Sequence, residues 1–368
     1  MIDPAAVEDA RSYLKSNASA LNEVLGQYWR EKRESWAQVA SIVADAADAY
    51  DVLTSDGKKI RASLVKLGYD ACLHPNSPVP RTAEDLLRAA ASVEVLHNAF
   101  LIHDDIVDNS SLRRNVPTVH RRYAESSRSR FASDEEALEY GRAIALNFGD
   151  EGQALAQDLL ISSGFPTGVL LRGVTLLSEV TIQTVMGQLL DVEDIKIEEL
   201  TEDLVLQIHQ YKTAHYTIML PLLLGATLAD APATALDHIR EFAVPIGIAF
   251  QIQDDILGLF GNEEELGKPV DSDIKEAKKT LLFVHAYAAA DEVDRAFLRV
   301  VHGNGGLTAD DVARVRRIVR ETGALARSEA IGREQVERGK VYVDGITEKP
   351  EWRRILRGLA DYFIVRRT

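Results

Sequence analysis

The stretch "FLIHDDIVDNSSLRR", from Phe100 to Arg114, places three aspartates within five positions at the end of an apolar segment. On a helix, residues three or four apart share a face, so Asp104 and Asp108 stack while Asp105 lies on the neighbouring stripe. Carboxylates this close repel one another unless they are solvated, protonated or bound to a metal. One such cluster alone is typical of a solvated acidic helix end, so its meaning depends on the rest of the chain.

A second acidic cluster lies in "FQIQDDILG", where Gln251, Asp254 and Asp255 share a helical face. A third polar pair, Gln188 and Asp191, has helical i, i+3 spacing. Both aspartate clusters close an apolar helix and precede cationic residues. This arrangement indicates Mg²⁺, which is usually held by one or two carboxylates, several waters and substrate phosphates. Zinc is disfavoured because the chain has no cysteine pair and no histidines at ligand spacing.

Cationic side chains accompany both clusters. They are Arg113 and Arg114 after the first cluster, Lys268, Lys278 and Lys279 after the second, Lys212 beside Thr213, and Lys58, Lys59 and Arg61 in "DGKKIRA". Arginine forks match phosphate oxygens in a bidentate manner, and lysine acts as a point charge. Carboxylates, Mg²⁺ and cations together predict a site for one or two diphosphates. A nucleotide site is disfavoured because neither GxxxxGK[ST] nor GxGxxG occurs.

The composition excludes several other classes of protein. The chain has 368 residues and a formal net charge of −15, which disfavours nonspecific nucleic-acid binding. Its single cysteine, Cys72, rules out an intrachain disulfide and predicts a cytoplasmic location. The N-terminal stretch lacks a signal-peptide pattern, and charges interrupt the apolar stretches, so we expect no transmembrane segment.

Apolar residues recur at helical spacing almost throughout, which predicts one all-α domain over residues 1–368 with about ten or more helices. Pro245 lies inside a helical pattern and predicts a kink or break. We expect exposed loops at the Pro-, Gly- and Ser-rich stretches and at "RRYAESSRSR", residues 121–130. Arg366 and Arg367 are expected to belong to a solvated terminus, with reach into the site as the alternative.

Taken in order, these motifs resemble the trans-isoprenyl diphosphate (polyprenyl) synthases. The matching pieces are "DGKKIRA", "EVLHNAFLIHDDIVDNSSLRRNVPTVH", "GD" at Gly149 and Asp150, "GQLLD", "KTAHYT…PLLLGA", "FQIQDDILGLFG" and "GKPVDSDIKEAKKTLL". The resemblance spans residues 57–282. It implies an all-α bundle around a deep central cavity, assembled as a homodimer, that joins isopentenyl diphosphate to an allylic diphosphate head to tail.

The resemblance also implies roles for individual residues. Asp104, Asp108 and Asp254 would hold Mg²⁺, three ions in the active complex, with Asp105 and Asp255 supporting them. The allylic diphosphate would contact Arg113, Lys212, Thr213, Gln251, Lys268 and Lys278. The diphosphate of isopentenyl diphosphate would be bound by Lys58, Arg61, His97 and Arg114.

Four positions depart from the family's pattern. Asp56 replaces one of two glycines before the first lysine, and Ala62 stands where proline is common. The second cluster often reads DDxxD, but here its last position is Gly258, which removes a full second triad. The family's "EGK" is "EAK" here, with Ala277 in place of glycine, a change expected to be mild.

Product length is expected to depend on Ala99 and Phe100, five and four residues before Asp104. Phe100 lies one turn, about 5.4 Å, from Asp104 on the same helical face, where its ring could form a floor for the growing chain or serve as ordinary core. The partial floor favours geranylgeranyl diphosphate (C20), with farnesyl diphosphate (C15) next. A class I terpene cyclase, a noncatalytic subunit of a heteromeric synthase and a head-to-head condensing enzyme are the alternatives.

Overall fold

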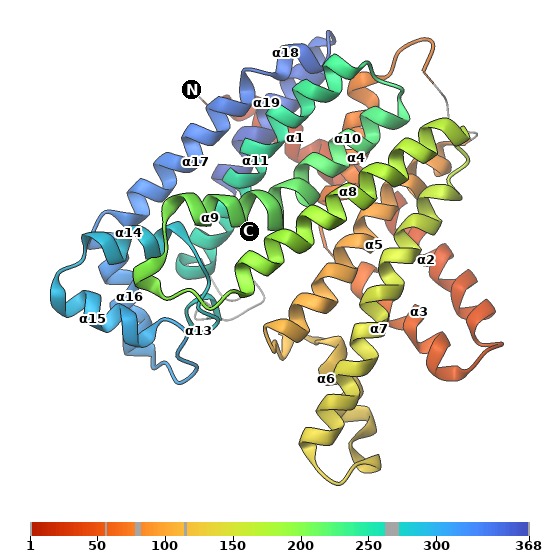
Figure 1. The fold of residues 1–368 in the computed structure, drawn as a ribbon. Coiled ribbons are helices and arrows are strands. Elements are labelled where there is room, and N and C mark those ends of the chain that lie inside the picture. Colours follow the sequence, from red (N-terminus) through yellow and green to blue (C-terminus); the bar gives the residue numbers. More distant parts are fainter. Residues whose placement is uncertain (1, 56, 78–81, 114–115, 262–271, 367–368) are drawn as a thin grey trace. The chain divides into compact units, whose positions relative to one another are not determined.

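The computed structural model describes residues 2–55, 57–77, 82–113, 116–261 and 272–366, which are almost entirely helical (Figure 1). The chain divides into two compact units. The N-terminal unit comprises Asp9–Ser178 and Leu220–Leu236. The C-terminal unit comprises Met1–Glu8, Glu179–Met219 and Asp237–Thr368. The all-α fold expected from the sequence is confirmed, whereas the assignment of residues 1–368 to a single domain stays a prediction.

The N-terminal unit contains the helices that carry the first acidic cluster. Its elements, some of which continue into the other unit, are α1 (Pro4–Ser16), α2 (Ala18–Trp36), α3 (Ser41–Ser55), α4 (Ile60–Cys72), α5 (Ala83–Val107), α6 (Val119–Ser127), the 3-10 helix η1 (Arg128–Arg130), α7 (Asp134–Ile161), the first part of α8 (Thr167–Val192) and α10 (Leu220–Leu228). Two short antiparallel strands of two residues each, β1 (Leu112–Arg113) and β2 (Val116–Pro117), follow the cluster, with Arg113 opposite Val116.

Helix α5 is the core helix of the N-terminal unit and packs along α7. A capping box starts it, because the Thr82 hydroxyl accepts from the Asp85 amide and the Asp85 carboxylate accepts from the Thr82 amide. The close approach of α7 depends on small residues. A Cβ on Gly152 would lie 2.8 Å from the Ala99 methyl, and one on Gly149 would lie 2.0 Å from the His103 ring. These glycines let α7 lie against the turns of α5 that precede the aspartates.

The C-terminal unit carries the second acidic cluster on its longest helix. Its elements are the last part of α8, the 3-10 helix η2 (Ile197–Glu199), α9 (Glu202–Ile208), the π-helix η3 (His209–Met219), α11 (Ala233–Phe260), α13 (Ser272–Lys275), α14 (Leu281–Ala289), α15 (Glu292–Val301), α16 (Ala309–Glu321), α17 (Ala324–Lys340), α18 (Val343–Ile346) and α19 (Pro350–Val365).

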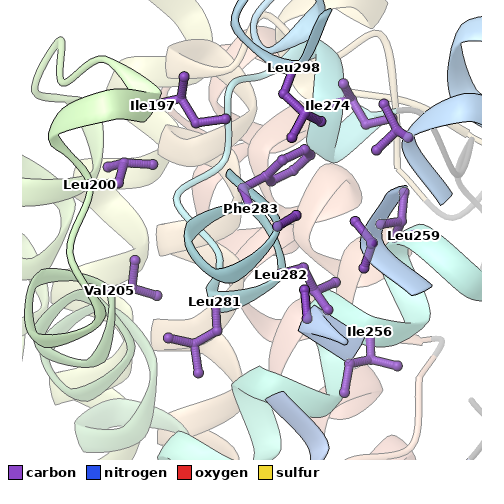
Figure 2. Packing of buried hydrophobic residues seen from close by; sticks show 14 of the residues in the cluster. Ile197, Leu200, Val205, Ile256, Leu259, Ile274, Leu281, Leu282, Phe283 and Leu298 are labelled. Atoms are coloured by element: carbon purple, nitrogen blue, oxygen red, sulfur yellow. The ribbon is translucent and has the colours of Figure 1, made fainter. Parts of the chain in front are cut away.

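A continuous apolar cluster forms the core of the C-terminal unit (Figure 2). Phe283 of α14 is almost fully buried, and Leu298 of α15 lies close to it. Leu259 at the end of α11 and Ile274 of α13 belong to the same cluster. Burial of this apolar surface fixes the segments on both sides of residues 262–271.

Three local expectations need correction. Helix α11 continues through Pro245, so the expected break does not occur, and the alternative of a kink stays a prediction. Residues 121–127 belong to α6 and residues 128–130 to η1, because Val119, Tyr123 and Ala124 recur at helical spacing and are buried. Arg366 is not solvated: its side chain is 8% exposed, and its guanidinium pairs with Asp254. Arg367 lies outside the described residues.

Two helices, α8 and α11, are long and apolar enough to cross a membrane by length and composition alone. The apolar window of α11 is 67% buried inside the structure, as in the core helix of a globular protein. That of α8 is 39% buried. Both are weak evidence for a membrane span.

Candidate active site

The first acidic cluster lies at the C-terminal end of α5. Asp104 and Asp105 belong to the last helical turn, and Asp108 caps the helix, with its amide donating to the Asp104 carbonyl. The side chain of Asp104 is 24% exposed, whereas that of Asp105 is 4% exposed. Neighbouring aspartates on one helix therefore face different surroundings, as expected for adjacent helical stripes.

Arg113, from β1, holds the buried member of this cluster. Its Nε and Nη2 both donate to Asp105 Oδ1, at 2.8 Å and 2.6 Å, while Nη2 lies 3.8 Å from Asp104 Oδ2. Burial alone lowers the pKa of Arg113, but attraction and hydrogen bonding by Asp105, reinforced by Asp104 and Asp108, raise it above its ordinary value. Asp105 is thus a fixed anchor, and Asp104 keeps an accessible face.

The residues assigned to isopentenyl diphosphate also lie in the N-terminal unit. Lys58 is exposed, Arg61 is partly buried in the first turn of α4, and His97 is buried on α5. Lys59, which carried no assigned role, is buried at the α4 N-cap with a left-handed backbone. Arg114 and Asp56 lie outside the described residues.

The structure explains why alanine can stand at position 62. Its backbone N–H donates to Glu94 Oε1 at 3.0 Å, and Glu94 is buried on α5. Proline has no N–H and could not make this bond. The departure from the family's pattern therefore ties the first turn of α4 to α5.

The two candidate chain-length residues differ in their surroundings. Ala99 is fully buried, next to Gly152 of α7, so its side chain belongs to the contact between α5 and α7. Phe100 is partly buried. Of the two, only Phe100 keeps exposed surface on which a prenyl chain could rest.

The second acidic cluster lies near the C-terminal end of α11, in the C-terminal unit. The side chain of Asp254 is 40% exposed, and its Oδ1 accepts a hydrogen bond from Arg366 Nη2. Arg366 follows α19 and also stacks on the Phe250 ring, with 4.0 Å between guanidinium carbon and ring centroid. From the sequence, reach of Arg366 into the site was only the less favoured alternative, because no local pattern signals a contact between partners 112 residues apart.

Asp255, by contrast, is buried, with its Oδ1 hydrogen-bonded and its Oδ2 without a hydrogen bond. Gln251 Nε2 donates to Oδ1 at 2.8 Å, and His209 Nε2 lies 3.0 Å from Oδ2. Thr213 in turn donates to Gln251 Oε1 at 2.9 Å. The side chains of His209 and Asp255 are 4% and 7% exposed, so this is a buried pair. His209 is a further residue that the sequence did not single out.

His209, Lys212 and Thr213 all come from the π-helix η3. Such segments are wider than an α-helix and frequently lie at functional sites. Two glycines make room for it: a Cβ on Gly187 of α8 would lie 2.2 Å from the Lys212 amide nitrogen, and one on Gly247 of α11 would lie 2.5 Å from Ala214 Cα. Gly187 thus has a structural reason in the "GQLLD" motif.

Three lysines of this unit each pair with a carboxylate or a carbonyl oxygen. Lys212 Nζ donates to Asp191 Oδ2 at 2.6 Å, and Lys279 Nζ donates to the Asp191 carbonyl. Burial lowers the pKa of Lys279. Lys278 Nζ donates to Asp273 Oδ1 at 2.8 Å. Lys268 lies outside the described residues.

The two clusters share one pattern. In each, the first aspartate of the pair is partly exposed, and the second is buried and fixed by a basic side chain. Within the described residues, no group of three or more His, Cys, Asp and Glu side chains could hold a metal ion by itself. These donors fit Mg²⁺ rather than a closed protein site, because Mg²⁺ takes one or two carboxylates and completes its shell with water and phosphate oxygens.

Comparison with known proteins identifies the class. The polyprenyl synthetase family matches residues 44–320. A geranylgeranyl diphosphate synthase of Saccharolobus solfataricus is 31% identical over 275 residues, which cover 74% of this chain and 75% of that protein. A (2E,6E)-farnesyl diphosphate synthase of Mycobacterium bovis is 32% identical over 319 residues, covering 85% and 80% of the two chains.

A solved structure agrees with these relatives. The geranylgeranyl pyrophosphate synthase from Corynebacterium glutamicum, complexed with isoprenyl diphosphate and magnesium, superposes with a TM-score of 0.89 at 31% identity. The match covers 96% of this chain and 99% of that one. The chain belongs to the polyprenyl synthetase family. It is accordingly a prenyltransferase that acts on isoprenyl diphosphates, as the resemblance in the sequence implied.

Proposed function

We propose that this prenyltransferase condenses isopentenyl diphosphate with an allylic diphosphate and stops at geranylgeranyl diphosphate (C20), with farnesyl diphosphate (C15) as the second product. The observation that carries the reaction is the shared pattern of the two clusters. Asp104, Asp108 and Asp254 would bind Mg²⁺, three ions in the active complex, with Asp105 and Asp255 supporting them. Family membership and the magnesium bound by the Corynebacterium glutamicum enzyme support this assignment.

The reaction requires stabilisation of a leaving group. The allylic C–O bond breaks, the electron pair leaves with the diphosphate, and an allylic cation remains. Mg²⁺ would supply charge stabilisation to the departing oxygens. Arg113, Lys212 and Lys278 add fixed positive charge, which is effective because it is in place before the bond breaks.

Carbon–carbon bond formation follows. The double bond of isopentenyl diphosphate attacks the cation, and a proton is then lost from the new adduct. We assign Lys58, Arg61 and His97 to the diphosphate of isopentenyl diphosphate, together with Arg114. Lys268, Thr213 and Gln251 complete the assigned contacts to the allylic diphosphate. The released diphosphate is the proposed base.

The enzyme is further proposed to be a cytoplasmic homodimer. The last part of α8 exposes an apolar row at helical spacing, formed by Ile182, Val185, Met186, Leu189 and Val192, each 49–63% exposed. A contiguous exposed apolar surface of this kind marks interaction sites. Replacing Ile182 and Leu189 by glutamate should give monomers in analytical ultracentrifugation, and an unchanged mass would contradict this interface.

One assay tests the function. Labelled isopentenyl diphosphate is incubated with dimethylallyl, geranyl or farnesyl diphosphate and Mg²⁺, and products are separated by chain length. Elongation to C20 is expected. Hydrocarbon formed from farnesyl diphosphate alone, or no elongation with any primer, would refute the proposal. Phe100→Ala should lengthen the product by one or more C5 units, because the ring is proposed to limit the chain.

A further inference from the structure

Gly258 occupies the place where the family's second motif often has a third aspartate, and the space beside it is already filled. A Cβ built on Gly258 would lie 2.1 Å from Asp273 Oδ2 and 3.1 Å from its Cγ. Cβ atoms do not approach other heavy atoms this closely in real proteins. The carboxylate of Asp273 therefore lies against the backbone of α11 at the position from which a third aspartate would project.

Asp273 is held in that place from several directions. Its side chain is 5% exposed, and Oδ1 accepts from Lys278 Nζ at 2.8 Å. Its backbone carbonyl accepts from the Lys278 amide at 3.0 Å. The residues that follow Gly258 and Asp273, Leu259 and Ile274, are both buried in the core cluster shown in Figure 2. Neither backbone can move away without disturbing that core.

We propose that Asp273 replaces the missing third aspartate of the second motif as a positioning residue. It aims Lys278 at the allylic diphosphate, and it can do so only because residue 258 has no side chain. The proposal rests on the proposed function, since it takes Lys278 as a diphosphate ligand. It makes Gly258 a requirement of this site rather than a loss. Restoring the DDxxD pattern should therefore impair the enzyme.

The paired carboxylate has a second effect on Lys278. A lysine ammonium is a point charge on a flexible stem with several rotamers. A charge-assisted hydrogen bond to a buried acceptor restricts those rotamers before substrate arrives. Its Nζ also lies 3.5 Å from Glu276 Oε2, and an ammonium group carries three N–H donors in all. If Asp273 is displaced, Lys278 keeps its charge but is no longer held in one orientation. The expected effect is weaker binding of the allylic substrate, in addition to any loss of folding stability.

The test uses four variants of the full-length protein: Gly258→Ala, Gly258→Asp, Asp273→Asn and the double variant Gly258→Ala with Asp273→Ala. Gly332→Ala is the matched control. Gly332 is also a buried helical glycine of the C-terminal unit, but a Cβ there would meet Ile252 Cγ2 at 3.7 Å, an ordinary contact. Thermal unfolding and steady-state kinetics with each substrate varied in turn are measured for all five proteins.

Gly258→Ala should raise the KM for the allylic diphosphate about tenfold, as expected for one lost charge-assisted hydrogen bond, with the KM for isopentenyl diphosphate nearly unchanged. Gly258→Asp should be worse, and Asp273→Asn should fall between wild type and Gly258→Ala. The double variant should regain thermal stability lost in Gly258→Ala but not its allylic KM. Gly332→Ala should behave as wild type.

Wild-type kinetics in Gly258→Ala, or activity at or above wild type in Gly258→Asp, would overturn the proposal. Equal rises in both KM values would also overturn it, because they indicate a general structural defect. If Gly258→Ala does not fold, recovery of folding in the double variant supports the steric coupling, and failure to recover refutes it. A wild-type protein without elongation activity would refute the proposed function. The steric coupling between positions 258 and 273 would still be tested, because thermal unfolding is measured without substrate.

Discussion

Replacing Arg366 by alanine should lower the Mg²⁺ concentration that the enzyme needs for activity. In the structure the Arg366 guanidinium pairs with Asp254 Oδ1; the Arg366 side chain is 8% exposed and that of Asp254 is 40% exposed. Mg²⁺ bound at Asp254 would compete with this pair for the same carboxylate. Mg²⁺ binding at Asp254 is therefore weakened by the free energy needed to break the ion pair. Without the arginine this cost disappears, and Mg²⁺ should bind more tightly.

The magnitude follows from the exposure of the two partners. A solvent-exposed ion pair contributes about 0–1 kcal/mol, and removing one partner of a buried pair costs about 3–5 kcal/mol. Because Asp254 is partly exposed, this ion pair is expected to contribute about 1–2 kcal/mol, between the two cases. Because about 1.4 kcal/mol corresponds to a tenfold change in an equilibrium constant, the Mg²⁺ concentration for half-maximal rate should fall about tenfold in Arg366→Ala.

The assay measures the initial rate against free Mg²⁺ at saturating substrates, together with the Tm with and without Mg²⁺. Without metal, Arg366→Ala should lower the Tm by a few degrees at most, about 2–4 °C per kcal/mol for chains of this order of size. Arg357→Ala is the control, because that arginine lies on α19, the helix that Arg366 follows, and pairs with the exposed Asp344 of α18. An unchanged Mg²⁺ dependence in Arg366→Ala, or the same shift in Arg357→Ala, would refute the reasoning.

Three further predictions concern the site and its stability. Asp104→Ala and Asp254→Ala should each lower kcat by about a hundredfold or more, because the leaving group then lacks charge stabilisation. Chelation of divalent metal should abolish turnover for the same reason. Full activity in either variant would contradict the metal assignment. Ala277 has φ +51°, so Ala277→Gly should raise the free energy of unfolding by about 1 kcal/mol in a denaturant titration, and a lower value would show that the alanine is not strained. Burial, aided by Arg121 and Arg142, lowers the pKa of His120 to about 4, and burial lowers that of His215 to about 4. These two histidines take up protons in the unfolded chain below about pH 6.5 but not in the folded one, so the Tm should fall between about pH 6.5 and pH 4, and less steeply when both are replaced by asparagine.

The sequence predicted what depends on local periodicity. The helices, the acidic clusters at their ends and the stacking of Asp104 with Asp108 follow from 3.6-residue spacing and capping, which neighbouring residues determine. Of the assigned ligands, Thr213 and Gln251 belong to one hydrogen-bond network of the C-terminal unit, and Lys212 is the neighbour of Thr213 in the chain. The roles themselves stay predictions that the variants above would test.

What the sequence did not predict depends on contacts between distant segments. His209 against Asp255 and Arg366 against Asp254 involve side chains 46 and 112 positions apart, where no local pattern records the pairing. The helical state of residues 121–130 was missed because arginines and serines masked a buried stripe. The π-helix was missed because its extra residue per turn is imposed by its neighbours rather than by its own composition.

That widened helix limits how this enzyme can evolve. An α-helix turns about 100° per residue, so losing one residue from 209–219 would swing everything beyond it around the axis. Gly187 and Gly247 would then face a narrower α-helix and leave a gap. The side chains of His209 and Lys212 would no longer keep their positions relative to the residues after the deletion. A larger residue at position 187 or 247 fits only if residues 209–219 change as well, so these three stretches of chain must change together.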